Sequence, residues 1–157
     1  MNKTAPLLIL INDTTTDDSP GEGEFQRWID HTFQLIQPSK IAHYVNIALV
    51  DEAHMQSLNR QFRNKDKPTN VLSFPGQPIP GEGEDDLLGD LALCPSVINQ
   101  EAKEQNIERS NHWAHITVHG ILHLLGYDHE LDSEAKTMEA FEVEILSTLG
   151  YPNPYQE

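Results

Sequence analysis

Short apolar runs alternate with longer amphipathic segments along this chain of 157 residues. Each apolar run has the length of a β-strand and ends in turn-forming residues. In the longer segments apolar side chains recur every three or four residues, as on one face of a helix. Because strands that alternate with helices are typical of α/β proteins, we expect the α/β (α+β) class, with one mixed sheet of about four strands packed with helices.

The boundaries of these elements follow from the apolar periodicity and from the glycine and proline positions. The expected strands are Leu7–Ile11, Tyr44–Val50, Asn70–Phe74 and Leu87–Cys94. The expected helices run from Phe25 to Ile36, from Asp51 or Glu52 through Phe62, and over Pro95–Gln105, Glu108–Leu125 and Ser133–Leu149. A chain of this length suits one domain, so residues 1–157 are expected to form a single domain.

The chain is strongly acidic, with 25 Asp and Glu residues against 10 Lys and Arg and a net charge of −15. Such a surface disfavours unselective binding of nucleic acid. No apolar run approaches the roughly 20 residues that a membrane span needs, and the first residues lack the features of a signal peptide. We therefore expect a cytoplasmic protein with no membrane partner. The single cysteine, Cys94, is expected to be a buried strand residue.

Three histidines around the end of one predicted helix form a metal-binding pattern. Residues 119–129 read His-Gly-Ile-Leu-His-Leu-Leu-Gly-Tyr-Asp-His. His119 and His123 share a helix face about 6 Å apart along the axis, and Gly126 can end the helix so that the chain carries His129 back. Three imidazoles leave one tetrahedral position open, as in catalytic zinc sites. The spacing predicts one Zn²⁺ per chain, held by His119, His123 and His129 at the end of a long helix.

His115 offers a competing arrangement. Because His112, His115, His119 and His123 fall within an arc of about 80° on the helix, His115 and His119 could also share an ion. His115 lies about 12 Å along the axis from His123, however, and no turn near it supplies a third ligand. The set that ends in His129 is therefore favoured.

A basic segment interrupts the acidic sequence. Arg60, Arg63, Lys65 and Lys67 lie within eight positions, with Asp66 the only acid among them. Cations favour helix C-termini, so a solvated helix end is one interpretation. The other is a phosphate-binding segment, because cations near a metal can hold a phosphodiester and offset the charge of its transition state.

The histidine spacing also matches the metzincin metallopeptidases. In those enzymes the residue after the first histidine is a glutamate that acts as the general base, whereas here it is Gly120. Peptide hydrolysis would need another base. A metzincin-like metallopeptidase is thus an alternative, and a non-catalytic protein with a purely structural zinc is another.

Three segments together resemble the bacterial YbeY family of endoribonucleases and rRNA maturation factors. They are Leu-Asn-Arg-Gln-Phe-Arg-Asn-Lys-Asp-Lys-Pro-Thr-Asn-Val-Leu-Ser-Phe-Pro at 58–75, Leu-Gly-Asp at 88–90, and the histidine segment at 119–129. The resemblance implies a zinc-dependent endoribonuclease that is specific for single-stranded RNA. It further implies a cytoplasmic role in maturing small-subunit ribosomal RNA, notably its 3′ end, and in ribosome quality control, with the small subunit and its assembly proteins as partners. Under this resemblance residues 1–157 would form a single metal-dependent endoribonuclease domain. The non-catalytic alternative would be a ribosome-assembly factor with a structural zinc.

The same resemblance implies residue roles. The metal ligands would be His119, His123 and His129, and Arg63 would be the catalytic arginine. Position 70, often an aspartate in that family, is Asn70 here.

Further candidates follow from what an RNA substrate requires. The candidate substrate-binding residues are Arg60, Lys65, Lys67, Thr69 and Ser73, and the candidates for a supporting role beside the metal ligands are Asp128 and His115. A planar guanidinium binds phosphate through two parallel hydrogen bonds, which favours Arg63 as the transition-state clamp. The general base is not assigned.

Overall fold

The computed structural model describes residues 5–12, 14, 18–38, 42–76, 87–128 and 130–155. Its elements are β1 (Leu7–Asn12), α1 (Glu22–Ile36), β2 (Tyr44–Leu49), α2 (Glu52–Arg63), β3 (Val71–Pro75), β4 (Leu87–Leu93), α3 (Pro95–Gln105), α4 (Arg109–Leu124) and α5 (Asp132–Thr148). The predicted alternation of strands and helices is confirmed. The largest shift is in α1, which begins at Glu22 rather than Phe25.

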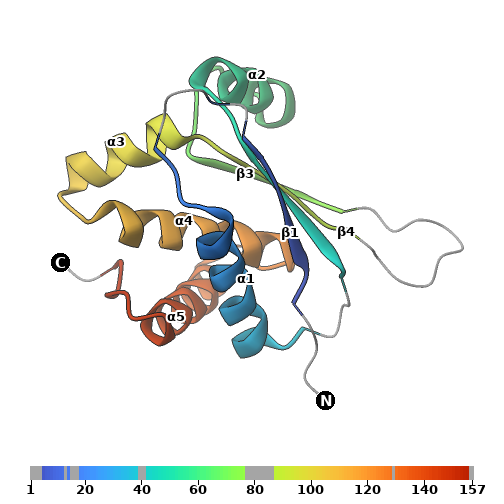
Figure 1. Ribbon diagram of the computed structural model, residues 1–157, viewed down its shortest axis with the longest axis vertical. Coiled ribbons are helices and arrows are strands. Elements are labelled where there is room, and N and C mark those ends of the chain that lie inside the picture. Colours follow the sequence, from blue (N-terminus) through green and yellow to red (C-terminus); the bar gives the residue numbers. More distant parts are fainter. Residues whose placement is uncertain are drawn as a thin grey trace, which may run out of the picture.

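The four strands form one mixed sheet in the order β1-β2-β4-β3 (Figure 1). β1 runs parallel to β2, β2 runs parallel to β4, and β3 pairs with β4 in the antiparallel direction. β3 therefore occupies one edge of the sheet, with Val71 opposite Leu93 and Pro75 opposite Gly89. The expected class, a single α+β domain with a four-stranded mixed sheet, is confirmed.

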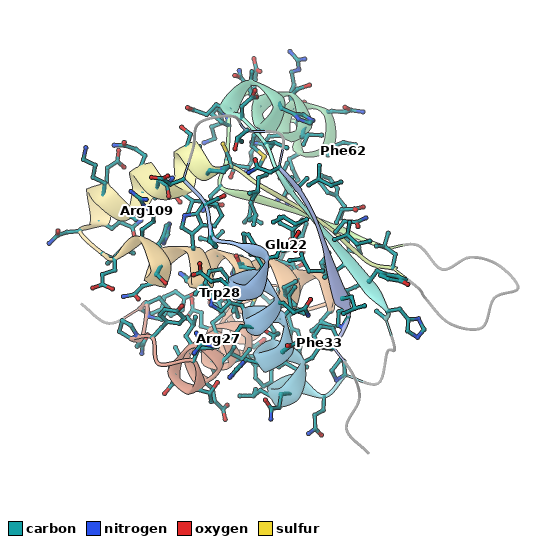
Figure 2. The ribbon with its side chains drawn as sticks, in the orientation of Figure 1. Glu22, Arg27, Trp28, Phe33, Phe62 and Arg109 are labelled. Carbon is teal, nitrogen blue, oxygen red and sulfur yellow. The ribbon has the colours of Figure 1, made fainter. Side chains whose placement is uncertain are left out.

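Helices cover the two faces of the sheet unequally. The main core lies between one face and α1, α4 and α5, and it includes the fully buried Trp28 (Figures 1 and 2). A smaller cluster on the other face joins Met55 of α2 to Leu72 of β3 and Cys94. Phe62, near the end of α2, is 55% exposed and contacts Phe74 with ring centroids 5.0 Å apart. None of the described helices is long and apolar enough to cross a membrane.

α4 packs closely against the sheet at Gly120. A Cβ atom there would lie 2.9 Å from the side chain of Leu91 and 3.2 Å from that of Val71. A side chain at this position would therefore fit only if Leu91 and Val71 moved, which makes glycine the best-suited residue for this close approach. The hydroxyl of Ser73 on β3 donates a hydrogen bond to the carbonyl of Gly120 at 3.2 Å. This contact fixes β3 beside the C-terminal half of α4.

We expect Gly120→Val to destabilise the fold by about 1–3 kcal/mol, because its Cβ atom and two methyl groups would overlap Leu91 and Val71. Equilibrium unfolding in urea measures this. Gly23→Ala on α1 is the matched control, because nothing lies within 4 Å of its Cβ position. It should leave stability unchanged or raise it by up to about 1 kcal/mol. Equal stability of Gly120→Val and the unchanged chain would contradict the packing argument.

Candidate functional site

The C-terminal end of α4 brings two of the predicted metal ligands together. The Nε2 atoms of His119 and His123 lie 3.1 Å apart. Beyond the helix, Gly126 has φ +99°, and the N–H of Tyr127 donates to the carbonyl of Leu122 at 3.0 Å. The chain thus reverses at Gly126, as the sequence predicts. The third predicted ligand, His129, lies outside the described residues.

The two imidazoles fit a shared metal ion. Two nitrogen ligands at 2.0–2.1 Å on a tetrahedral zinc ion are about 3.3 Å apart, close to the 3.1 Å between Nε2 of His119 and Nε2 of His123. Within the part of the chain that the structure describes, no group of three His, Cys, Asp or Glu side chains is arranged to hold a metal. The predicted third ligand lies outside the described residues, so the three-ligand site stays a prediction.

A buried carboxylate contacts the Nδ1 atom of His119, the ring nitrogen that does not face His123. Glu142 of α5 is 1% exposed, and its Oε1 accepts a hydrogen bond from Nδ1 of His119 at 2.8 Å. Its Oε2 accepts from Nε2 of His115 at 2.6 Å and from the hydroxyl of Tyr155 at 2.7 Å. Burial by itself raises the pKa of Glu142, but the hydrogen bonds from His115 and His119 lower it to about 2. The side chain is therefore a carboxylate at neutral pH.

A groove of about 280 Å³ opens in front of the two histidines. It is lined by Arg63, Asn70, Val71, Ser73, Pro75, His119 and His123. Arg63 is the last residue of α2, which stops because Asn64 adopts the left-handed conformation with φ 58°. The groove thus brings together Arg63, Ser73 and two of the three predicted ligands.

The other predicted substrate-binding residues lie outside the lining of this groove. Arg60, Lys65 and Lys67 are exposed, and Thr69 is half-buried. Their segment folds back on α2, because the amide of the buried Asn59 donates to the carbonyl of Lys67 at 2.8 Å. These three cations therefore lie on the surface, close to Arg63 in sequence. From there they can contact a long polyanion that extends beyond the groove, but not a small ligand inside it.

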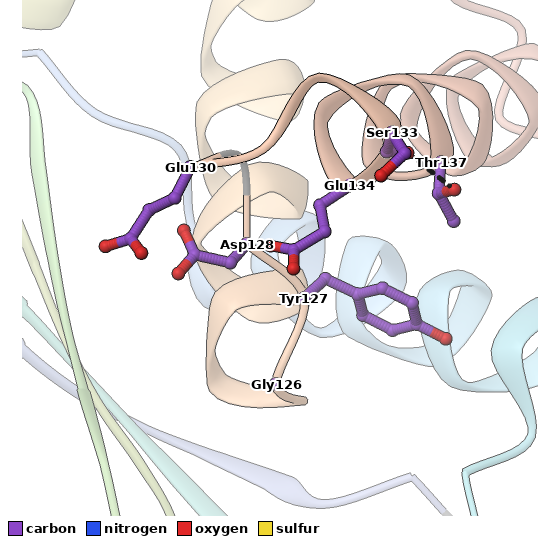
Figure 3. Close-up of a pocket in the computed structure, with 7 residues that line it drawn as sticks. All are labelled: Gly126, Tyr127, Asp128, Glu130, Ser133, Glu134 and Thr137. Atoms are coloured by element: carbon purple, nitrogen blue, oxygen red, sulfur yellow. Dashed lines mark hydrogen bonds between the residues drawn. The ribbon is translucent and has the colours of Figure 1, made fainter.

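The candidates for a supporting role are also separated from the groove. Asp128 lines a second pocket of about 550 Å³ with Gly126, Tyr127, Glu130, Ser133, Glu134 and Thr137. Figure 3 shows Asp128 and Glu130 on the segment after α4, and Glu134 on the first turn of α5. His115 lies on α4 one turn before His119, contacts its ring edge to face with centroids 6.3 Å apart, and shares Glu142 with it.

Sequence reasoning missed Glu142. A signal was present, because Met138, Glu142 and Ile145 share the buried face of α5 and an acid interrupts an otherwise apolar stripe. A buried acid in such a stripe needs partners, which identifies it as part of a polar network. Its partners, however, lie on a different helix and on the C-terminal segment, so the sequence alone does not name them.

Asn70 takes part in a second network at the groove. Its side-chain amide donates to Glu101 of α3 at 3.1 Å, and Nε2 of the buried His112 contacts the same Glu101 oxygen at 3.0 Å. Burial raises the pKa of Glu101, but the hydrogen bonds from His112 and Asn70 outweigh burial and lower it. An aspartate at position 70 would face this carboxylate without a hydrogen to donate.

We expect Asn70→Asp to destabilise the fold by about 1–2 kcal/mol at pH 7, because a donor is replaced by a second negative charge. Repulsion raises the pKa of both carboxyl groups, so the deficit should be small near pH 4 and grow as the pH rises through those values. Urea unfolding at several pH values measures this. Asn70→Ala removes the same hydrogen bond without adding a charge. If the free energies of unfolding of Asn70→Asp and Asn70→Ala differ by the same amount at every pH, the two carboxylates do not repel each other.

Two comparisons with known proteins agree with this architecture. The solution structure of TM1509 from Thermotoga maritima superposes with a TM-score of 0.55 at 23% sequence identity, over 95% of this chain and 100% of that one. This similarity concerns the fold. The family model described as endoribonuclease YbeY matches residues 10–150, which include both histidines of the groove and Arg63. The chain therefore belongs to the YbeY endoribonuclease family.

Proposed function

We propose that this protein is a zinc-dependent endoribonuclease that cleaves single-stranded RNA. It acts in the cytoplasm on small-subunit ribosomal RNA, notably at the 3′ end, and in ribosome quality control. Its partners are ribosomal RNA, the small ribosomal subunit and the assembly proteins of that subunit. One Zn²⁺ per chain is held by His119, His123 and His129.

The observation that carries this proposal is the composition of the groove. The Nε2 atoms of His119 and His123 converge to 3.1 Å in the same groove that Arg63 lines. Nitrogen ligands beside a guanidinium suit a substrate that is both electrophilic and anionic, as a phosphodiester is. Membership of an endoribonuclease family supports the same substrate class.

Arg63 is the proposed catalytic side chain. Its guanidinium can donate two parallel hydrogen bonds to non-bridging phosphate oxygens and stabilise the charge that develops on them. Ser73 and Thr69 are proposed to bind the substrate nearby. Zinc bound by the histidines would supply Lewis acidity and a water of lowered pKa.

The basic segment around Arg63 is proposed to guide the RNA strand. Arg60, Lys65 and Lys67 are exposed beside the groove residue Arg63 in the chain. Because the remainder of the chain is acidic, unselective attraction of RNA is weak. The ribosomal subunit would then supply much of the selectivity by presenting the strand.

The peptidase alternative has no support at position 120. Gly120 has no side chain that could act as a base, and a Cβ atom there would meet Leu91 and Val71. A purely structural zinc, the other alternative, would leave Arg63 without a chemical role. Both alternatives predict outcomes that differ from those of the nuclease.

Two variants test the proposal. We expect His119→Ala to lose bound zinc and cleavage of single-stranded RNA. Arg63→Glu should keep its zinc and cleave about 10²–10³-fold more slowly, because a transition-state donor is lost. Zinc content is measured by elemental analysis, and cleavage with a labelled oligonucleotide. Lys103→Glu is the matched control: it makes the same charge change on an exposed position of α3 and should cleave normally.

Other outcomes would overturn the nuclease. If Arg63→Glu cleaves as fast as the Lys103→Glu control, the activity does not come from this groove. Turnover of casein that survives Arg63→Glu would favour the peptidase. Zinc-loaded protein that cuts no RNA but loses thermal stability when zinc is removed would favour the structural role.

The guiding role of the lysines has its own measurement. The binding constant of metal-free protein for single-stranded RNA is measured at several salt concentrations. In Lys65→Ala and in Lys67→Ala, the slope of log K against log salt should be less steep by about 0.7 than in the unchanged protein. Lys103→Ala should leave the slope unchanged. Identical slopes for all three variants would exclude a phosphate contact by either lysine.

A further inference from the structure

Glu142 carries a charge in a place where an unpaired charge would be strongly unfavourable. The side chain is 1% exposed and lies on the face of α5 that carries Met138 and Ile145. A buried carboxylate persists only when its oxygens accept hydrogen bonds. Glu142 accepts three, and their division between its two oxygens defines what it does.

Among the described residues, one oxygen of Glu142 accepts a hydrogen bond from His119 alone. Oε1 accepts from Nδ1 of His119 at 2.8 Å, whereas Oε2 receives both Nε2 of His115 at 2.6 Å and the Tyr155 hydroxyl at 2.7 Å. His115 and Tyr155 thus hold the carboxylate through Oε2, and Oε1 is directed at His119. Glu142 of α5 thus orients the His119 ring, and His115 of α4 and Tyr155 of the C-terminal segment hold Glu142.

An ionised carboxylate can only accept, so each partner must donate. His119 therefore carries its proton on Nδ1, and in the neutral ring Nε2 presents its lone pair. That same Nε2 lies 3.1 Å from Nε2 of His123. Carboxylates that hold the second nitrogen of a histidine ligand are a general device for fixing tautomer and ring orientation at metals.

We infer that Glu142 is the positioning residue of the metal site, and that Tyr155 and His115 hold it in place. The inference rests on the proposed function in one respect, the identity of the bound ion. It also assigns a role to the C-terminal segment. Tyr151 of that segment accepts a hydrogen bond from Trp28 at 3.3 Å, and Tyr155 then reaches Glu142, so the end of the described chain supports the metal site.

The test compares two glutamates of α5. Glu142→Gln keeps the shape of the side chain but leaves one accepting oxygen for three donors, so zinc affinity should fall about 10–100-fold. Glu144→Gln makes the same change at an exposed position of the helix and should bind zinc as the unchanged protein does. Affinity is measured by competition with a chelator at a temperature at which every variant is folded. Equal zinc affinity in Glu142→Gln and Glu144→Gln overturns the inference.

A second measurement separates positioning from simple stabilisation and needs no metal. Nitrogen-15 NMR of the metal-free protein should show the His119 proton on Nδ1, and in Glu142→Gln a mixture of the two tautomers. Tyr155→Phe removes one partner of Oε2 and should weaken zinc binding only a few-fold. His119 protonated on Nε2 in the unchanged protein would overturn the inference even if zinc binds. Absence of zinc binding would refute the proposed metal, while the tautomer would still decide the role of Glu142.

Discussion

The contact between α4 and the sheet at Gly120 is the constraint on which the site depends. Leu91 and Val71 occupy the space where a side chain at position 120 would lie, so the helix axis is held close to β3 and β4. His119 precedes this contact by one residue and His123 follows it by three. With one face of the helix packed against the sheet, both imidazoles lie in the groove that β3 residues also line. The packing at Gly120 therefore positions the two histidines beside β3.

The row of histidines on α4 acquires different roles from the carboxylates that flank it. Glu101 of α3 contacts His112, whereas Glu142 of α5 accepts from both His115 and His119. By helical spacing alone His115 and His119 are as suitable a pair of ligands as His119 and His123. Glu142 separates them, because Nε2 of His115 is engaged with the carboxylate while Nε2 of His119 faces His123.

The parts of the structure that were predictable from the sequence are those with local causes. Apolar periodicity gave all nine described elements, and the end of α4 followed from Gly126, whose φ is +99°. The antiparallel placement of β3 and the pairing of α4 with α5 depend on contacts distant in sequence. Glu142 was missed for this reason, since it lies 23 residues from His119. Arg63 was predicted from family resemblance, and a helix end by itself would not have distinguished it from Arg60.

Charge explains how an acidic chain could take a polyanionic substrate from one direction only. On one side of the groove α2 ends in Arg63, with Arg60 and two lysines exposed nearby in the chain. Beyond the end of α4 the second pocket gathers the acids Asp128, Glu130 and Glu134 (Figure 3). A phosphodiester chain is attracted to the first region and repelled by the second, and both effects are screened within about 10 Å at 0.1 M salt. If RNA binds in this groove as proposed, this charge distribution favours its approach along α2 and disfavours its continuation across α5.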